Sequence, residues 1–391
     1  MPARRVELEG CRSCGYCSQV VDCPAGDPLW RRDECYGCGA CVPACPYGAR
    51  RLVEVEREPI EVAVDGESVE VEARWVEGTL RELGVEVESP CGVGGCYACA
   101  VKVNGELRPA CNTGLEEGDE VRTEGVRRDV RVMSGFQPHG VGGVGTPVEL
   151  KDRPGPVEAA CFAHGCNLRC PQCQNHVIAF GAASGARMTA EEAARLVVGT
   201  AREHGIDRVA ISGGEPTLNP DFLVEFVRRC RELEPGVRVH VDTNGTVLTP
   251  GYVDRLVEAG MTDLGIDIKG FRPETFARIA GVDRERAAEY LDNVLRVLEY
   301  LADEYLDEEL FVGVGIPYNP ALVDKEEVFA LTDWLYAHVG EELQVCYLDY
   351  RPEFRRRDLP LPRYEDMVEL EEYARSLGFK RVHAQKVSVR R

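Results

Sequence analysis

The spacing of its cysteines constrains the fold of this chain more than any other feature of the sequence. Eighteen cysteines occur in 391 residues, and fifteen of them fall into four groups along the chain. In a long chain, thiolates two or three residues apart favour metal sites over disulfides. We therefore expect a chain organised around several metal centres, in a reducing and anaerobic setting.

The composition narrows the class of protein. Hydrophobic residues make up 44% of the chain, enough for the cores of roughly two to four domains. No apolar run approaches the length that spans a bilayer, and the first residues, MPARRVELEG, lack an apolar signal core. We therefore expect a cytoplasmic protein without a membrane partner. The net charge of −21 argues against a nucleic-acid partner, because phosphate contacts require a basic face.

Residues 1–58 contain two similar cysteine runs, each of which ends in Cys-Pro. The second run matches the pattern of bacterial ferredoxins, and the first differs by two extra residues before its last cysteine. In that pattern the fourth cysteine of each run binds the other cluster. The resemblance implies two four-iron clusters, one on Cys11, Cys14, Cys17 and Cys45, and the other on Cys35, Cys38, Cys41 and Cys23. Paired zinc sites are the alternative, although zinc usually takes Cys-x-x-Cys pairs separated by a spacer.

Residues 59–133 have a β-rich pattern. Apolar and polar residues alternate around Asp65-Gly66, which predicts a hairpin, and 79–84 is a candidate short helix. A glycine-rich loop follows, with cysteines in the order Cys-x4-Cys-x2-Cys and a distant fourth, namely Cys91, Cys96, Cys99 and Cys111. This order resembles plant-type ferredoxins and implies one two-iron cluster on a β-grasp domain. A structural zinc is the alternative.

A Gly-rich stretch separates this module from the rest of the chain. It begins SGFQPHGVGGVGTP and lacks the Lys-Ser/Thr ending of a phosphate loop. The pattern predicts a flexible linker over 134–156, in which His139 is incidental.

From residue 157 to 391, candidate strands alternate with amphipathic stretches. The candidate strands are 157–162, 208–212, 237–242, 263–268, 310–316 and 343–348. Thr189 and Glu192 form a capping box, and Asn219-Pro220 and Thr249-Pro250 mark two further helix starts. Six consecutive βα units imply a parallel sheet curled into a partial barrel, with its active residues at the C-terminal ends of the strands.

The loop after the first of these strands reads CNLRCPQC and contains Cys166, Cys170 and Cys173. Three thiolates hold three corners of a four-iron cluster and leave one iron open for a reaction. The spacing resembles the signature of the radical SAM enzymes. In that family the open iron chelates S-adenosylmethionine, and one electron cleaves the sulfonium to give a 5′-deoxyadenosyl radical. The resemblance implies a third four-iron cluster and a multidomain α/β fold, with a radical SAM partial (βα)6 barrel after the two ferredoxin-like modules.

The other strand ends resemble those of glycyl-radical-enzyme activases of the pyruvate formate-lyase activating type. By this resemblance Gly213, Gly214 and Glu215 bind the amino group of the methionine moiety, and Lys269 pairs with its carboxylate. The motif Asp242-Thr243-Asn244-Gly245, with Asp267, holds the ribose or a monovalent cation. The plainer alternatives are a helix-entry acid for Glu215, a cap for Asp242 and a surface lysine for Lys269.

Two features depart from the activase pattern. Gln172 stands where activases usually have an aromatic residue against the adenine, and the ferredoxin-like modules precede the whole barrel instead of following the cluster motif. These departures concern the activase subfamily and do not affect the radical SAM resemblance.

The sequence thus predicts an enzyme in which the N-terminal clusters pass single electrons to the barrel cluster. Its expected partners are S-adenosylmethionine, a reductase or other low-potential donor, and a protein whose glycine loses a hydrogen atom. One alternative is a small molecule or coenzyme precursor as substrate. Another is a non-catalytic electron-transfer protein in which every cluster has four protein ligands.

Four other residues or segments carry expectations. Cys161, Cys230 and Cys346 are expected in the core. The run Arg355–Arg357 is expected to be a solvated loop, with the alternative that it holds an anionic substrate or a partner protein.

Overall fold

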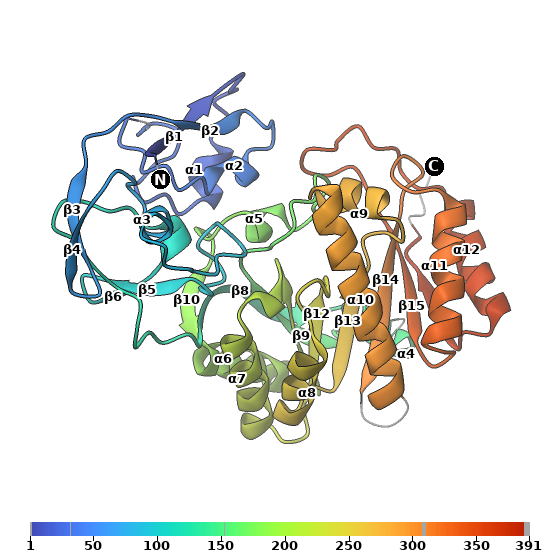
Figure 1. The fold of residues 1–391 in the computed structure, drawn as a ribbon. Coiled ribbons are helices and arrows are strands. Elements are labelled where there is room, and N and C mark those ends of the chain that lie inside the picture. The colour runs from blue at the N-terminus through green and yellow to red at the C-terminus, as the bar shows by residue number, and fades with distance from the viewer. Residues whose placement is uncertain (1, 32, 152, 307–309, 387–391) are drawn as a thin grey trace.

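The computed structural model describes residues 2–31, 33–151, 153–306 and 310–386, and arranges them around three β-sheets (Figure 1). The sheets have two, five and nine strands. In Figure 1 the blue N-terminal elements lie next to α5 (His176–Ala179), which follows the cysteine loop of the large sheet. Within the described ranges, no helix is both long and apolar enough to cross a membrane.

The N-terminal module has little regular structure. Strands β1 (Arg4–Leu8) and β2 (Arg50–Glu54) pair antiparallel and bring its two ends together. Between them lie two short helices, α1 (Tyr16–Val20) and α2 (Cys41–Ala44), and each contains one cysteine of the predicted clusters. So small a segment cannot bury a large apolar core, which agrees with a module organised around its cysteines.

The second module is a five-stranded sheet in the order β4-β3-β7-β5-β6. Its elements are β3 (Ile60–Val64), β4 (Glu67–Val71), α3 (Val76–Glu82), β5 (Ala100–Val103), β6 (Glu106–Pro109), η1 (Ala110–Asn112) and β7 (Glu120–Arg122). The predicted hairpin at Asp65-Gly66 is confirmed, and both residues have positive φ, as such a turn requires. Antiparallel β5 and β6 similarly meet at Asn104-Gly105. The expected β-grasp fold is therefore present.

The third module is a nine-stranded sheet in the order β10-β8-β9-β11-β12-β13-β14-β15-β16, parallel from β9 to β16. Its strands are β8 (Val130–His139), β9 (Glu158–Ala163), β10 (Ala186–Thr189), β11 (Arg208–Gly213), β12 (Arg238–Thr243), β13 (Asp263–Asp267), β14 (Phe311–Tyr318), β15 (Gln344–Asp349) and β16 (Arg381–Ala384). Its helices are α6 (Ala190–His204), η2 (Pro216–Leu218), α7 (Pro220–Leu233), α8 (Pro250–Ala259), α9 (Pro273–Ala280), α10 (Arg284–Glu304), α11 (Lys325–His338) and α12 (Tyr364–Leu377). The six predicted strands are confirmed as β9 and β11 to β15. The parallel strand β16 and the antiparallel strands β8 and β10 were not predicted.

The predicted helix starts are confirmed in detail. Thr189 Oγ1 accepts from Glu192 N at 3.2 Å, and Thr189 N donates to Glu192 Oε2 at 2.8 Å, so both halves of the capping box form. The side chains of Asn219 and Thr249 accept hydrogen bonds from the first turns of α7 and α8. These predictions are reliable because each cap depends only on residues three positions apart in the sequence.

The prediction of a flexible linker over 134–156 is wrong. Residues 130–139 form β8 (Val130–His139), which pairs with β9 and β10 in the large sheet, and 148–151 form the short helix α4 (Val148–Lys151). The β-rich module therefore ends before Val130 instead of at residue 133. Residues 140–147, here named the glycine segment, connect β8 to α4 and contact the inner face of the barrel strands. The glycines here allow two backbones to approach closely. In the sequence alone, such a segment has the same pattern as a flexible glycine-rich linker.

The three ungrouped cysteines lie in the core, as predicted. Cys161, Cys230 and Cys346 are at most 2% exposed. The Cys161 thiol donates to Ala210 O at 3.5 Å across the pair β9–β11. The Cys161 thiol is therefore engaged inside the sheet, which disfavours it as a fourth cluster ligand beside the loop that follows.

Candidate functional site

The cysteine loop of the barrel starts at the C-terminal end of β9. Gly165 has a φ of 86°, which lets the chain turn sharply just before Cys166. Burial raises the pKa of the Cys166 thiol to about 12, and the nearby Glu215 and Cys170 act in the same direction. Burial also raises the pKa values of Cys170 and Cys173. Three neighbouring thiols, of which Cys166 is buried and the other two are half-buried, ionise readily only when a positive centre neutralises them, which fits the ligands of a metal cluster.

Gly213 and Gly214 join the end of β11 to this loop. Gly214 N donates to Ala163 O at 2.8 Å, and Glu215 N donates to Gly165 O at 2.9 Å. A Cβ atom on Gly214 would lie only 2.3 Å from Gly165 O. The glycine pair is therefore required for the backbone of β11 to reach the cysteine loop.

The Glu215 carboxylate is completely buried and ties β11 to β12. Its Oε1 accepts from Thr217 Oγ1 and Thr243 Oγ1, both at 2.6 Å, and its Oε2 accepts from Asn244 N at 2.7 Å. Burial raises the pKa of Glu215, and these hydrogen bonds act against that shift. A carboxylate oxygen has about two acceptor positions, so Oε2 keeps room for one further donor.

Asn244, which follows β12, connects the end of that strand to the cysteine loop. Its Nδ2 donates to Asn167 Oδ1 at 3.0 Å and lies 3.9 Å from Cys166 Sγ. Asn167 in turn donates to Thr246 Oγ1 at 2.8 Å. Sequence reasoning missed Asn167 and Thr246. Asn167 directly follows Cys166, and Thr246 directly follows the motif at the end of β12. These positions were the signal in the sequence that could have identified both residues.

The buried Lys269 and the half-buried Asp267 form a charged pair at the end of β13. Lys269 Nζ lies 3.2 Å from Asp267 Oδ2 and donates to Tyr350 Oη at 3.0 Å. Burial lowers the pKa of Lys269, but Asp267 and Tyr350 outweigh it, so the pKa lies well above its ordinary value. Asp267 Oδ1 is buried and has no hydrogen-bond partner among the described residues. The charged ammonium of Lys269 suits an anionic group of a ligand. The free Oδ1 of Asp267 suits a hydroxyl group or a cation.

Asp242 lies between the other strand ends and the glycine segment. Its Oδ1 accepts from Val144 N at 3.2 Å and lies 3.2 Å from His240 Nε2, and its Oδ2 accepts from Ser212 Oγ at 3.4 Å. Burial lowers the pKa of His240, but Asp242 and Glu158 outweigh it and raise the pKa to about 10. A buried imidazolium therefore lies beside the Asp242 carboxylate.

The glycine segment lies against the inner face of the barrel. Gln344 Nε2 donates to Val144 O at 2.8 Å and to Thr146 O at 2.9 Å. A Cβ atom on Gly313 of β14 would lie 2.2 Å from Val144 O, so this strand must have glycine there. Glycines in neighbouring strands signal the close approach of another backbone, and this signal in β13 and β14 could have revealed the segment.

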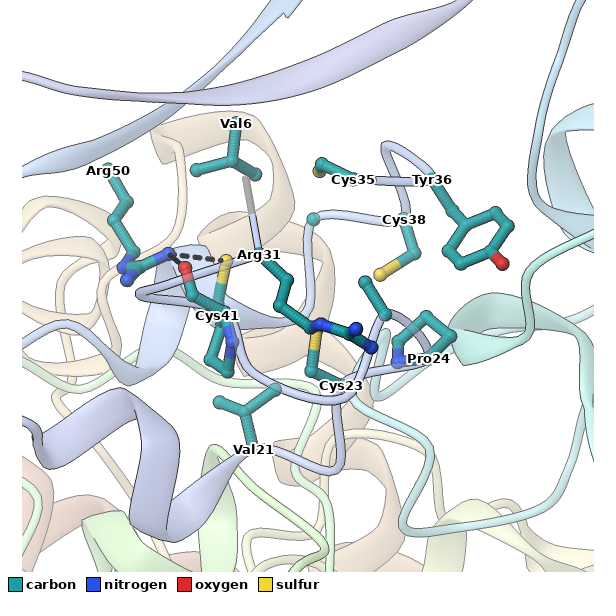
Figure 2. Close-up of a pocket in the computed structure, with 13 residues that line it drawn as sticks. Val6, Val21, Cys23, Pro24, Arg31, Cys35, Tyr36, Cys38, Cys41 and Arg50 are labelled. Carbon is teal, nitrogen blue, oxygen red and sulfur yellow. Dashed lines mark hydrogen bonds between the residues drawn. The ribbon is translucent and has the colours of Figure 1, made fainter. Parts of the chain in front are cut away.

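The eight N-terminal cysteines surround two separate cavities. One is lined by Cys11, Cys14, Cys17 and Cys45. The other is lined by Cys23, Cys35, Cys38 and Cys41 (Figure 2). These are the two sets that the ferredoxin resemblance implies, each with one cysteine from the other run. Within the described ranges, no group of three His, Cys, Asp or Glu side chains is placed to hold a single metal ion.

The four cysteines of the β-grasp module converge in its interior. Cys91, Cys96, Cys99 and Cys111 are at most 1% exposed. Hydrogen bonds from Cys111 and Cys96 lower the pKa of Cys91 well below its ordinary value. Gly92 and Gly94 have positive φ, so the loop can wrap around the four sulfurs.

The loop of the β-grasp module that contains Cys91 and Cys96 contacts the cysteine loop of the barrel directly. A Cβ atom on Gly165 would lie 3.1 Å from Cys91 Sγ, and Arg169 Nη2 donates to Cys91 O at 2.7 Å. A Cβ atom on Gly95 would lie 2.6 Å from the carbonyl carbon of His164. The backbones of the two loops are therefore in van der Waals contact.

The N-terminal module contacts the same barrel loop through Arg355. Its side chain donates to Cys45 O at 2.8 Å and Pro43 O at 2.9 Å, while its backbone N donates to Pro171 O at 2.9 Å. The expectation of a solvated loop is therefore wrong for Arg355, because carbonyls of a distant module surround its guanidinium. Tyr16 Oη also hydrogen-bonds His176 Nδ1 from the α1 side.

Gln172, which departs from the activase pattern, is also placed. It is buried, and its Nε2 donates to Ile279 O at 2.9 Å. Its Oε1 is buried and has no hydrogen-bond partner within the described ranges.

Comparison with known families agrees with this geometry. A family model for the radical SAM superfamily matches residues 161–329. The barrel is a radical SAM domain. A 4Fe-4S binding domain matches residues 28–51 and a 2Fe-2S iron-sulfur cluster binding domain matches residues 62–126. The chain is thus an enzyme with a radical SAM domain that follows its ferredoxin domains, and these domains account for S-adenosylmethionine, 4Fe–4S and 2Fe–2S groups as cofactors.

Individual relatives of this radical SAM enzyme differ in their named activities. It is 27% identical over 233 residues to a putative glycyl-radical enzyme activating enzyme of Methanocaldococcus jannaschii, covering 57% of this chain and 87% of the relative. It is 29% identical over 227 residues to a probable GTP 3′,8-cyclase of Thermococcus kodakarensis, covering 56% of this chain and 67% of the relative. Among solved structures, it is similar to a domain of a pyruvate-formate lyase-activating enzyme from Bacteroides vulgatus, with a TM-score of 0.37 and 19% identity over 45% of this chain and 98% of that one.

Proposed function

We propose that this chain cleaves S-adenosylmethionine reductively, with electrons that its own N-terminal domains deliver, and uses the radical to remove hydrogen from a glycine of a partner protein. One observation supports in-chain delivery above all others. The cysteine loop of the β-grasp domain contacts the barrel loop that contains Cys166, Cys170 and Cys173 directly, through Cys91 against Gly165. Arg355 of the barrel connects the N-terminal module to the same loop, because it donates to Cys45 O and to Pro171 O. Fusing a donor in this way raises its effective concentration at the site.

The cofactors are proposed as three four-iron clusters and one two-iron cluster. The two cavities of the N-terminal module and the three barrel cysteines would hold the four-iron groups, and the β-grasp cysteines the two-iron group. When bound, the barrel cluster supplies the electron that cleaves the sulfonium of S-adenosylmethionine to a 5′-deoxyadenosyl radical.

The residues of the barrel would orient S-adenosylmethionine. Glu215 Oε2 has an acceptor position for the methionine amino group, and the Lys269 ammonium is paired closely enough to stay charged for the carboxylate. Asp267 Oδ1 and Asp242 are the oxygen groups proposed for the ribose or a monovalent cation. The glycine segment would close the barrel interior beneath these groups and exclude water from below.

Production of 5′-deoxyadenosine tests the core of this proposal. Anaerobically reduced protein with S-adenosylmethionine is expected to form it, as measured by chromatography and mass spectrometry. The Cys170→Ala variant is expected to form none above background, since it removes one cluster ligand. Equal yields from the two proteins would contradict the proposal.

The substrate is proposed from the motif after β12, Lys269 and the Methanocaldococcus relative, all of which favour an activase. A small molecule or coenzyme precursor is the second candidate, and the similarity to a probable GTP 3′,8-cyclase favours it. Deuterium transfer into 5′-deoxyadenosine discriminates between them. Transfer from a glycine-deuterated partner protein supports activation, whereas transfer from a labelled metabolite pool supports the second candidate.

The non-catalytic alternative is disfavoured by Cys161, whose thiol is engaged inside the sheet and leaves the barrel loop with three cysteines.

A further inference from the structure

Arg50 connects the two cysteine sets of the N-terminal module. Its Nη2 donates to Cys17 Sγ at 2.9 Å, in the first set, and its Nη1 donates to Cys41 Sγ at 3.3 Å, in the second. Nη1 also donates to Pro28 O at 2.8 Å. Figure 2 shows the guanidinium directed at Cys41 Sγ, and the side chain lines both cavities.

The burial of Arg50 makes these contacts significant. The residue is only 5% exposed, and a buried guanidinium is costly unless anionic groups compensate its charge. The partners recorded for it in the described part of the chain are two sulfurs and one carbonyl. The position is therefore stable only if the sulfurs carry negative charge, as they do when they bind a metal cluster.

Hydrogen bonds to the sulfurs of an iron–sulfur cluster and nearby positive charge favour its reduced form, which carries one more negative charge. Solvent screens such an effect weakly at a buried site. A single guanidinium between two sets acts on both sets at once.

We propose that Arg50 is a positioning residue that raises the reduction potentials of both four-iron sites of the N-terminal module together. Each site takes one electron from a low-potential donor and no proton, and Arg50 stays protonated throughout. This inference rests on the proposed function, because it assumes a four-iron cluster in each cavity.

Potentiometric titration followed by EPR tests the proposal without measuring activity. The background is a Cys166→Ala/Cys170→Ala/Cys173→Ala variant, so that only the N-terminal domains contribute signals, with dithionite as the reductant. Arg50→Gln is compared with Arg31→Gln. Arg31 lines the second cavity, but its side chain is 57% exposed and pairs with Glu34 at 3.4 Å.

Arg50→Gln is expected to lower both four-iron midpoints and leave the two-iron midpoint unchanged. Because it removes two charge-assisted hydrogen bonds, the reduced-to-oxidised ratio at a fixed potential should fall about tenfold for each site, or about 59 mV for a one-electron couple. Arg31→Gln is expected to shift neither midpoint by more than a small fraction of this. If Arg50→Gln does not retain its iron, Arg50→Lys, which keeps the charge, is titrated instead and should show smaller shifts in the same direction.

Unchanged midpoints, a shift at one site alone, or equal shifts in the Arg31 control would each overturn the proposal. An absence of four-iron signals and of the corresponding iron in the parent protein would instead contradict the cluster assignment itself. The two failures are therefore distinguishable.

Discussion

Lys269 carries a positive charge inside the barrel because its neighbours compensate it. Asp267 lies 3.2 Å from its ammonium and Tyr350 accepts at 3.0 Å. The pair lies beside Cys170, whose charge also raises the pKa of Lys269. Its proposed role as a carboxylate partner came from resemblance alone, whereas the pairing with Asp267 required the fold.

Replacing Lys269 is expected to weaken S-adenosylmethionine binding. Lys269→Met should raise the dissociation constant about tenfold or more, since hydrogen bonds to charged groups contribute about 1.5–3 kcal/mol. Tyr350→Phe removes only one neutral partner and should have a much smaller effect. Equilibrium binding under anaerobic conditions measures both. A Lys269→Met/Asp267→Asn variant avoids an unpaired buried carboxylate, and wild-type affinity in it would contradict the assignment.

His240 should make the stability of the barrel depend on pH. Its pKa is raised from 6.5 to about 10, because Asp242 and Glu158 outweigh its burial. The stabilisation from this proton is fully present below pH 6.5 and is lost as the pH rises to about 10. Between these values the free energy of unfolding should fall on the order of 1 kcal/mol per pH unit.

Denaturant titrations from pH 6.5 to 9.5, compared with His240→Gln, measure this dependence. The difference between the two proteins should shrink as the pH rises. A His240→Gln difference that does not change with pH would show that the imidazole is neutral in the folded protein.

At the scale of elements, signals confined to one stretch of sequence were reliable. The alternation of strands and helices predicted β9 and β11 to β15, and caps such as Thr189 identified where helices begin. The strands β8 and β10 were missed because their pairing is antiparallel and distant in sequence. The glycine segment was misread because its meaning depends on glycines such as Gly313, far along the chain.

The glycine segment supplies a prediction of its own. A Cβ atom on Gly143 would lie 2.1 Å from Asp242 Oδ2 and 2.7 Å from His240 Cε1, whereas one on Gly140 would meet no heavy atom within 4 Å. Gly143→Ala is therefore expected to destabilise the protein by about 1–3 kcal/mol. It should also displace Asp242 and lower the 5′-deoxyadenosine yield. Gly140→Ala is the matched control and should change neither quantity. Equal behaviour of the two variants would show that the segment does not press on Asp242.

At the scale of the whole molecule, three cofactor-binding modules meet at one loop. The resemblance to bacterial ferredoxins sorted the N-terminal cysteines into the same sets that line the two cavities. The contacts between modules were not predictable, because Arg355 and Pro171 lie far apart in sequence and carry no pattern that links them. Only the fold reveals that the β-grasp module contacts the loop with Cys166, Cys170 and Cys173 directly, and that Arg355 connects the N-terminal module to that loop.

The central claim is that electrons reach S-adenosylmethionine through this chain itself. The direct test uses protein reduced with dithionite, freed of the reductant, and mixed once with S-adenosylmethionine under anaerobic conditions. EPR measures the electrons lost from the N-terminal clusters, and mass spectrometry measures 5′-deoxyadenosine. The account predicts that the N-terminal signals disappear as 5′-deoxyadenosine forms, with one electron lost for each molecule produced. Product that forms while those signals stay unchanged, or signals that persist without any product, would contradict it.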